Sequence, residues 1–361
     1  MAEWIKTLVS MVVKMVIILA LAPVGMMYLT WLERKVIARM QDRIGPNRVG
    51  PYGLLQPLAD GIKMLTKEDT VPAGADRLCH FVAPILAVVP ALYLFTVLPF
   101  GPGLVAAPLT TGLLFFVAIG SLETIALFMA GWGSRNKFSL LGAVRNPAQL
   151  IAYEVPLVVG ISVVPMVVGS LNLVDIVHAQ EGMRWFLFTP WGLFGFFLVL
   201  TAGLAEVNRT PFDLPEAESE IVAGFHTEYS GIKFALFYMA EFLSTLAFSV
   251  LISTLFLGGW DGPFLSGWIW VALKTFLLVF TMIWIRGTFP RFRIDQLMGF
   301  AWKVMLPVAL VNLFGAALWF LMGGVLGNLL SFLLSFGTFL VTTQLWLKPR
   351  PYLSTKWVKW S

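Results

Sequence analysis

The sequence predicts an all-α, polytopic membrane protein with about nine transmembrane helices, eight in a core plus one at the C-terminus, and amphipathic helices on the cytoplasmic side. Of its 361 residues, 58% are hydrophobic and only 12% are charged, about half the charge of a typical soluble domain. Apolar runs of about 20 residues, the length that crosses a bilayer, recur along the whole chain. No linker separates them, so we expect one integral membrane domain over residues 1–361.

Nine apolar runs account for the predicted spans. The first, residues 8–31, lacks a signal-peptide cleavage site and ends at a charged stretch, so we expect it to remain as a span. The last two runs are separated only by a glycine-rich stretch, and one long broken helix is the alternative there. Spans two to five fall within residues 78–207, at 78–100, 112–131, 148–169 and 190–207, and spans six to nine within residues 233–346, at 233–260, 267–287, 301–323 and 327–346.

The lysines and arginines predict which side of the membrane each loop faces, because cytoplasmic loops are richer in them. Segments 33–77, 132–147, 208–233, 286–303 and the tail after residue 347 carry 8, 3, 2, 4 and 4 of the 25. These segments are therefore expected in the cytoplasm, with the N-terminus outside and the C-terminal tail, residues 347–361, inside. The net charge of +5 reflects this topology and does not indicate nucleic-acid binding.

The first cytoplasmic segment, residues 32–77, predicts two short helices on either side of a turn rich in proline and glycine at residues 44–53. After the turn, leucine and isoleucine recur at helical spacing, while Asp60 and Lys63 share the opposite face. Such an amphipathic helix lies in the membrane interface. It serves either as an anchor or as one wall of a lateral opening for a lipid-soluble substrate, and both interpretations stay open.

Four glutamates, each in or at the end of a different predicted span, are the most informative side chains: Glu123, Glu154, Glu206 and Glu241. A carboxylate at the centre of a bilayer helix costs roughly 2.5–3.5 kcal/mol. The rise of a helix places all four in the cytoplasmic half of the membrane, and none has an evident cation one turn away on its own helix. We expect them to face a polar cavity, a proton path or a buried partner. Protonated carboxyls that join helices by hydrogen bonds are the alternative.

The loop over residues 208–232 is unusual for a cytoplasmic loop because acids outnumber bases. Glu206 precedes it, and it carries Asp213, Glu216, Glu218, Glu220 and Glu228 against Arg209 alone, with Lys233 just beyond. Capping of a helix N-terminus accounts for Glu216 and Glu218 but not for the others. Clustered carboxyls are expected to titrate as a coupled set. The later inside segment places Arg286, Arg291 and Arg293 among aromatic residues, which either ordinary topology or contact with a polar headgroup explains.

Two lysines lie in the outer halves of predicted spans. Lys14 is near the outer end, and we expect it to extend its amine to the interface; for Lys274 the same behaviour and a functional role are both open. The single cysteine, Cys79, cannot hold an iron–sulfur cluster, which needs about four thiolates. The three histidines have no metal-ligand spacing, so no metal site is predicted.

Four stretches of the chain carry a family likeness: Trp31-Leu-Glu-Arg-Lys35, residues 43–63 with their Ile-Gly-Pro-Asn-Arg-Val-Gly-Pro-Tyr-Gly turn, residues 205–218 with Arg-Thr-Pro-Phe-Asp-Leu-Pro-Glu-Ala-Glu, and His226-Thr-Glu-Tyr-Ser230. They closely resemble the H subunit of the proton-pumping NADH:quinone oxidoreductase, respiratory complex I, of bacterial type. The related component of membrane-bound hydrogenases is less similar around residues 45–63. The resemblance extends over essentially the whole chain.

The resemblance implies a subunit of an enzyme, located at the joint between the peripheral and membrane arms of the complex in the bacterial cytoplasmic (inner) membrane. It would form most of a quinone chamber, which opens laterally between the first span, the amphipathic helix and the sixth span. The quinone is the substrate and is reduced by an iron–sulfur cluster of another subunit, so this chain is expected to hold no catalytic residue, flavin, metal or cluster. The implied partners are two peripheral-arm subunits at the quinone site, a small membrane subunit, lipid and quinone.

The resemblance also assigns residues to these roles. A polar funnel for protons would be lined by Glu123, Glu154, Glu206, Glu241, Asp213, Glu216, Glu218, Glu220 and Glu228. The wall of the quinone chamber would include Glu33, Arg34, Asp60, Lys63, Arg209, Phe212, Arg286, Arg291 and Arg293. We expect quinone reduction to change the protonation of the acidic loop, and the buried glutamates to relay that change. A stand-alone proton or cation transporter and a purely structural anchor for a peripheral enzyme are the alternatives.

Overall fold

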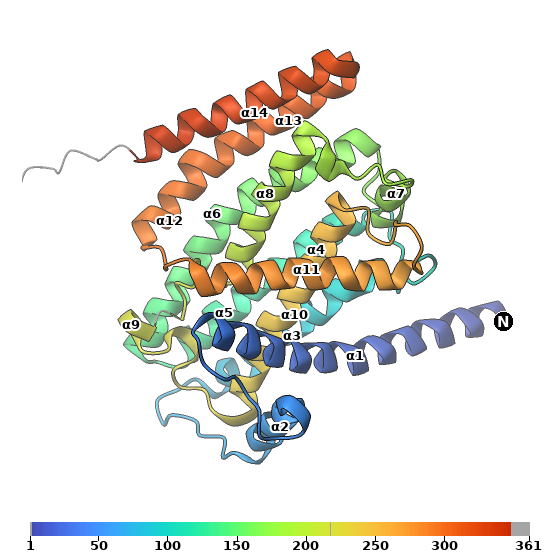
Figure 1. The fold of residues 1–361 in the computed structure, drawn as a ribbon. Helices are drawn as coiled ribbons and strands as arrows, with labels where there is room; N and C mark the ends of the chain where they lie inside the picture. Colours follow the sequence, from blue (N-terminus) through green and yellow to red (C-terminus); the bar gives the residue numbers. More distant parts are fainter. Residues whose placement is uncertain (1, 217, 348–361) are drawn as a thin grey trace, which may run out of the picture.

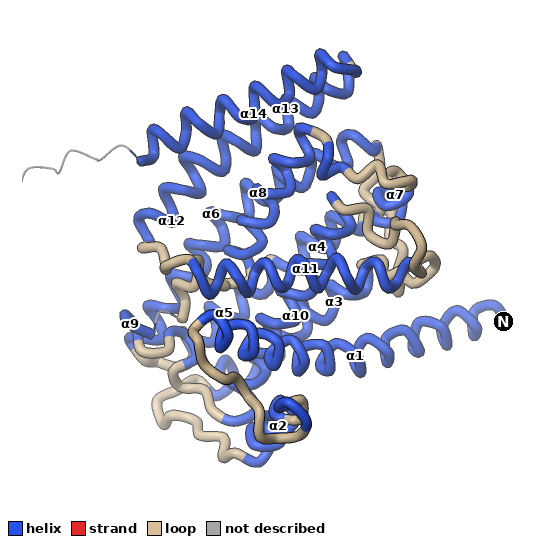
Figure 2. The backbone as a smooth tube through the Cα atoms, viewed as in Figure 1, coloured by secondary structure: helices blue, strands red, loops and turns tan. Residues whose placement is uncertain are grey.

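The computed structural model describes residues 2–216 and 218–347, with side chains for 9–216 and 220–347, and this part of the chain consists of helices and loops without a strand (Figure 2). The all-α prediction is confirmed. The helices are α1 (Ala2–Met40), α2 (Gln56–Thr66), α3 (Arg77–Val97), α4 (Gly112–Gly120), α5 (Leu122–Gly133), α6 (Lys137–Val168), α7 (Leu173–His178), α8 (Pro190–Glu206), α9 (Glu218–Ile221), α10 (Gly231–Phe256), α11 (Gly267–Thr288), α12 (Ile294–Phe300), α13 (Leu306–Met322) and α14 (Gly324–Leu347). Single turns of tighter or wider helix occur at Pro51–Gly53, Phe186–Phe188, Gly224–His226 and Ala301–Met305.

Eight helical segments of the described residues are long and apolar enough to cross a membrane, which confirms a polytopic membrane protein. They are α1, α3, α4 with α5, α6, α10, α11, α12 with α13, and α14. The fifth predicted span, residues 190–207, is the apolar helix α8, which has only 17 residues.

Several boundaries differ from the prediction because helical hydrogen bonding continues beyond the apolar run. α1 extends to Met40, so residues 32–40 lengthen the first span and do not form a separate short helix. α6 begins at Lys137, where the Asn136 side chain accepts a hydrogen bond from the backbone N–H of Phe138 at 2.9 Å and caps the helix. The eighth span begins at Ile294 and not at residue 301.

The last two helices, α13 and α14, lie side by side as an antiparallel pair at one edge of the molecule (Figure 1). Between them Gly323 and Gly324 have φ angles of 61° and 58°, a region that glycine adopts without steric strain. The chain therefore reverses here, and the alternative of one long broken helix is wrong. Small residues allow close packing of the pair: a Cβ added to Gly315 would lie 3.2 Å from Ser331 Oγ.

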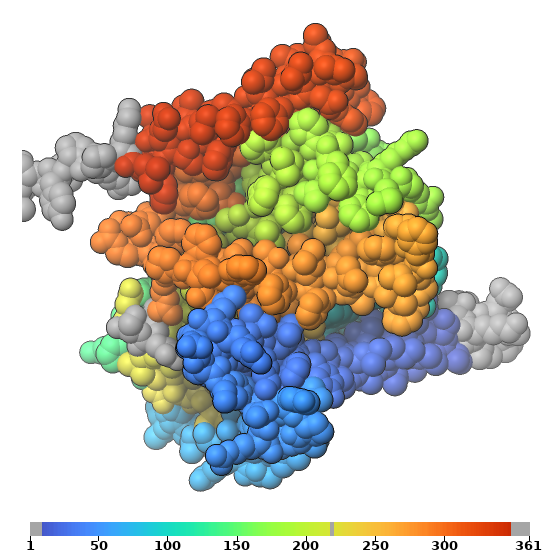
Figure 3. All heavy atoms as spheres, in the orientation of Figure 1, coloured from blue at the N-terminus to red at the C-terminus, as the bar shows by residue number. Residues whose placement is uncertain are grey.

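The central helix of the fold is α10, which contacts α1, α3, α8 and α11 and buries most of its side chains. Helices α3, α5, α6 and α8 pack in that order, each against the next, and α10 contacts both ends of this series. Helices α1 and α11 lie side by side on one face, coloured blue and light orange in Figure 3. Although α1 is the longest helix of the described residues, it buries few of its side chains.

The amphipathic helix α2 rests against α1 and α10. Its polar face is tied to α1 by an ion pair in which Arg34 and Asp60 approach to 2.6 Å. Its apolar side chains Leu58, Ile62 and Leu65 are exposed on the surface of this chain. The apolar stripe therefore faces away from the protein, as a helix lying in the membrane interface requires.

Candidate functional site

A buried cluster of charges joins three helices and the loop after α8. The Glu33 carboxylate, in the C-terminal part of α1, accepts hydrogen bonds from both Arg209 and Arg286. The Arg209 Nε lies 2.8 Å from the Glu241 carboxylate on α10. The guanidinium carbon of Arg209 also lies 4.0 Å from the centre of the Phe242 ring. Arg209 thus links carboxylates of α1 and α10, and Arg286 adds the end of α11.

The backbone positions Arg209 because α8 closes with a tight turn. The N–H groups of Val207 and Arg209 donate to the carbonyls of Gly203 and Leu204, both at 3.1 Å. This turn directs the guanidinium into the protein, where the side chain is only 4% exposed. Burial alone lowers the pKa of Arg209, but Glu241 and Glu33 outweigh this and raise the pKa above its ordinary value. Arg209 therefore supplies a permanent positive charge.

The partner of Glu241 could not be found from helical spacing. No cation lies one turn away on α10, as predicted, but Arg209 reaches Glu241 from a loop. Glu241 therefore lies in an ion pair within the protein. Such a pair compensates the desolvation of both charges only while both partners remain.

The other three glutamates inside the bundle form a series with Glu241. Glu123 accepts a hydrogen bond from Ser244 of α10 at 3.0 Å and interacts electrostatically with Glu241. Glu206 is 9% exposed and interacts electrostatically with both Glu154 and Glu123. The described side chains offer no hydrogen-bond partner to Glu206 Oε2. The structure therefore brings together all four glutamates that the sequence singled out.

The acids of the loop divide into two groups. Asp213 lies 2.8 Å from Arg291, Glu216 lies 3.6 Å from His226, and both interact electrostatically with Glu241. Glu220 instead pairs with Arg145 at 2.5 Å with 45% of its side chain exposed, and Glu228 accepts a hydrogen bond from Asn136 at 2.5 Å. The Glu218 side chain lies outside the described residues. Asp213 and Glu216 thus continue the series of glutamates into the loop after α8.

Asp213, Glu216 and His226 of the loop have pKa values that differ from those of the free side chains. Burial raises the pKa of Glu216 well above its usual value, and the charges of Glu241 and Asp213 act in the same direction. Burial also raises the pKa of Asp213, although Arg291 and Arg286 oppose the rise. Burial lowers the pKa of His226 to about 4. Glu216 therefore keeps its proton to a higher pH than a free glutamate, while the neighbouring His226 is neutral.

The residues predicted to line the quinone chamber do not all converge. Glu33, Arg209 and Arg286 meet in the charged cluster, and Arg291 joins Asp213 beside it. Phe212 is buried, and its ring packs against Tyr153 and Phe292. Four others lie nearer the surface: Arg34 and Asp60 in their ion pair, Arg293 with 73% of its side chain exposed, and Lys63 on the exposed surface of α2.

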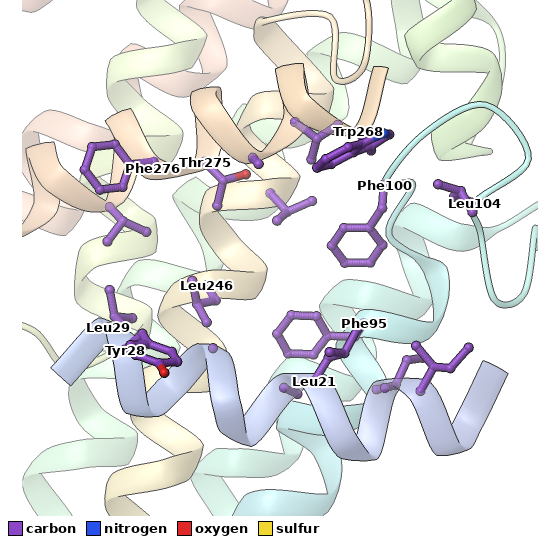
Figure 4. Close-up of a pocket in the computed structure, with 18 of the residues that line it drawn as sticks. Leu21, Tyr28, Leu29, Phe95, Phe100, Leu104, Leu246, Trp268, Thr275 and Phe276 are labelled. Atoms are coloured by element: carbon purple, nitrogen blue, oxygen red, sulfur yellow. The ribbon is translucent and has the colours of Figure 1, made fainter. Parts of the chain in front are cut away.

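An apolar cavity of about 790 Å³ lies between α1, α3, α10, α11 and the loop after α3. In Figure 4, Leu21 and Leu29 of α1 stand across from Phe95, Leu246 and Phe276. The lining extends along α1 from Lys14 to Leu32, roughly 27 Å of helix. Leu29, Leu246 and Val279 lie at its inner end.

The cavity and the charged cluster are neighbours along the same three helices. Glu33 follows the lining residue Leu32 on α1, Glu241 is about one turn from Leu246 on α10, and Arg286 is two turns from Val279 on α11. In between, Leu29, Phe242, Val279 and Ile283 form a small buried apolar cluster. These four side chains therefore separate an apolar compartment from a charged one.

The two lysines that the sequence placed in the outer halves of spans are anchored to backbone carbonyls. Lys14 donates to the carbonyls of Val105 and Ala106 at 3.0 and 3.3 Å. Lys274 is 4% exposed and does not extend to the interface: its amine donates to the carbonyls of Leu257, Gly259 and Asp261 at 2.6, 2.9 and 2.6 Å. Because α10 ends at Phe256, Lys274 binds the carbonyls that follow this helix.

Across residues 2–216 and 218–347, no group of three histidine, cysteine or acidic side chains is arranged to hold a metal ion. The fold and site define a class of protein: a polytopic membrane protein with a buried network of acids and arginines beside an apolar cavity. Residues 13–317 match the family described as NADH dehydrogenase. The chain belongs to this family, and its relatives are named as the H subunit of NADH-quinone oxidoreductase, which confirms the resemblance.

Three of these relatives illustrate the similarity. The protein of Dehalococcoides mccartyi (strain CBDB1) is 50% identical over 305 residues, which cover 84% of this chain and 85% of the relative. The protein of Thermomicrobium roseum is 47% identical over 332 residues, covering 86% and 96%. The protein of Geobacillus kaustophilus is 51% identical over 286 residues, covering 78% and 85%.

Proposed function

We propose that this chain is the membrane subunit of NADH:quinone oxidoreductase that forms the quinone chamber and couples quinone reduction to proton translocation. The observation that carries the proposal is the adjacency of the apolar cavity to the cluster of Glu33, Arg209, Arg286 and Glu241. A lipid-soluble substrate needs an apolar route from the bilayer, and a coupling device needs charges that respond to its chemistry. Both occur here on the same three helices.

The substrate is a quinone, whose long apolar tail suits the cavity between α1, α10 and α11. Its polar headgroup would pass Leu29 and Phe242 to reach Glu33, Arg209 and Arg286. The electrons come from an iron–sulfur cluster of a partner subunit. This chain therefore binds and orients the quinone and does not reduce it.

The coupling runs from the headgroup into the series of acids. A change of charge in the chamber alters the balance between Arg209 and its two carboxylates, Glu33 and Glu241. Asp213 and Glu216 then change their protonation, since both interact electrostatically with Glu241. Glu123, Glu206 and Glu154 carry the shift further into the membrane.

The partners are the other subunits of the complex: two peripheral-arm subunits at the quinone site and a small membrane subunit. The location is the bacterial cytoplasmic membrane with the N-terminus outside. Helices α9 and α12 lie at the end of the bundle opposite α7 and the N-terminus (Figure 1), which separates the basic and acidic loops from the outer face. The peripheral subunits would bind at the end with α9 and α12.

The decisive experiment replaces Glu206 or Glu241 by glutamine in the assembled complex and measures quinone reductase activity and proton pumping. We expect both variants to lose most of the pumping, because a neutral amide cannot release a proton. The control is Glu181→Gln, whose side chain is 56% exposed beside His178 near the outer loop and should leave both activities unchanged. Normal pumping in both test variants would remove these acids from the proton path.

A further inference from the structure

A continuous polar face of α6 is buried where an apolar helix face would be expected. Ser139, Asn146, Gln149 and Tyr153 recur at intervals of seven, three and four residues and therefore share one side of the helix. None is more than 1% exposed. Gly142 occupies the same face between Ser139 and Asn146.

Most polar atoms on this face have no hydrogen-bond partner among the described residues. These are Ser139 Oγ, both side-chain polar atoms of Asn146, and Gln149 Oε1. Tyr153 differs, because its hydroxyl donates to the carbonyl of Leu297 at 2.9 Å. Pro147 adds a further acceptor, since it cannot donate to the carbonyl of Ala143 one turn earlier. Buried polar groups that lack protein partners are typically bonded to ordered water.

The two ends of this face identify what such water would connect. At the cytoplasmic end, Gly142 packs directly on the acidic loop: an added Cβ would lie 2.9 Å from the carbonyl oxygen of Pro215, which precedes Glu216. At the inner end, the Gln149 amide donates to the Ala205 carbonyl at 2.9 Å and to Asn208 Oδ1 at 3.2 Å. These two residues flank Glu206, whose own Oε2 is buried without a partner among the described residues.

We infer that the α6 face of Ser139, Asn146 and Gln149 binds a file of water molecules that conducts protons between the acidic loop and Glu206. Each water accepts a proton from one neighbour and passes one to the next, so the amides orient the file and do not change their own protonation. Asn146 and Gln149 are positioning residues. This route reaches Glu206 without passing through the Arg209–Glu241 ion pair, and it rests on the proposed function.

The test compares three variants that each replace one buried asparagine, two at Asn146 and one at Asn312. Asn146→Leu fills the site with apolar atoms and should abolish most proton pumping in the assembled complex, while Asn146→Ser, which keeps a small polar group, should retain it. The matched control is Asn312→Leu on α13, because the Asn312 side chain donates to the Trp191 carbonyl and accepts from Ser335. Asn312→Leu should lower the melting temperature and leave the ratio of protons pumped to NADH oxidised unchanged.

The outcomes separate this inference from the proposed function. Loss of pumping in Asn146→Leu, together with a normal ratio in Asn312→Leu, supports the water file. If Glu206→Gln stops pumping but Asn146→Leu pumps normally, the file is wrong and the proposed function stands. If Glu206→Gln and Glu241→Gln also pump normally, the proposed function itself fails. Should Asn146→Leu not assemble, water density beside Asn146 in a high-resolution map of the wild-type complex decides: its presence supports the file and its absence overturns it.

Discussion

Arg209 shows how much of this site depends on a single side chain. One guanidinium contacts Glu33 of α1 and Glu241 of α10 and stacks on the Phe242 ring. Both carboxylates are largely buried, so neither has water as a substitute partner. The arrangement is stable only as a unit, since a buried charge without its partner is far more costly than the intact pair.

We therefore expect Arg209→Met to destabilise the protein by about 3–5 kcal/mol, the range for breaking a buried ion pair from one side. The measurement is the melting temperature of the purified complex in detergent. Adding Glu241→Gln to Arg209→Met should restore part of the loss, because it removes the charge of Glu241, which loses its arginine in the single variant, whereas Glu33 keeps Arg286. An unchanged melting temperature in the single variant would show that these charges are hydrated and not buried.

His226 gives a pH dependence with a definite sign. Its native pKa of about 4 lies below the ordinary 6.5, so between these values the unfolded chain binds a proton that the native protein does not. Stability is therefore fully present above pH 6.5 and falls as the pH drops towards 4. Burial causes the shift, and the rings of Phe225 and Phe234 lie 5.0 and 5.2 Å away.

The variant His226→Phe should flatten this fall. Phenylalanine fits among the neighbouring rings and has no proton to gain, so its melting temperature should decline less than that of the wild type between pH 6.5 and pH 4. Melting curves across this interval test the prediction. Parallel declines in the two proteins would mean that His226 titrates normally in the native state.

At the scale of elements, contact between α6 and the acidic loop depends on Gly142. A Cβ at this position would lie 2.8 Å from the Phe225 backbone nitrogen and 2.9 Å from both the Gly224 Cα and the Pro215 carbonyl oxygen. All three are backbone atoms, which cannot rotate away. The loop is thus held against the helix by the absence of a side chain.

Gly142→Ala should push the loop away from α6 at a cost of about 1–3 kcal/mol, typical of overpacking. Limited proteolysis should then cleave residues 208–230 faster, and proton pumping should fall because Asp213 and Glu216 lose their positions. Gly120→Ala on α4 is the control, since nothing lies within 4 Å of its added Cβ. Equal cleavage of both variants would contradict the contact.

Whole-molecule features divide into those that local sequence determines and those that depend on distant residues. The spans could be predicted because hydrophobicity and helix length are local, and the positions of Glu123, Glu154, Glu206 and Glu241 follow from counting along each helix. The extension of α1 to Met40 was missed because the charged residues Glu33, Arg34 and Lys35 end the apolar run, yet residues 32–40 contain no glycine or proline to stop the helix.

The partners of the charged residues could not be predicted. Arg209 and Glu33 are 176 positions apart in the chain, and no periodicity connects a loop with two separate helices. The hydrogen bonds of Lys274 could not be predicted for the same reason. The carbonyls that it binds belong to the residues after α10, which lie beside α11 only in the folded protein. The size of the cavity depends on how separate helices pack against one another, and composition does not determine that packing.

The contacts that hold α1 near its two ends have a consequence for how this helix can move. Its N-terminal part is tied by Lys14 to the carbonyls of Val105 and Ala106, and its C-terminal part by Glu33 to two arginines, while the stretch between lines the cavity. Pro23 interrupts the hydrogen-bond ladder near the middle of that stretch. Because α1 is fixed near both ends and weakened at Pro23, we expect its middle to bend outward reversibly. A large ligand could then enter the cavity while the contacts of Lys14 and Glu33 stay intact.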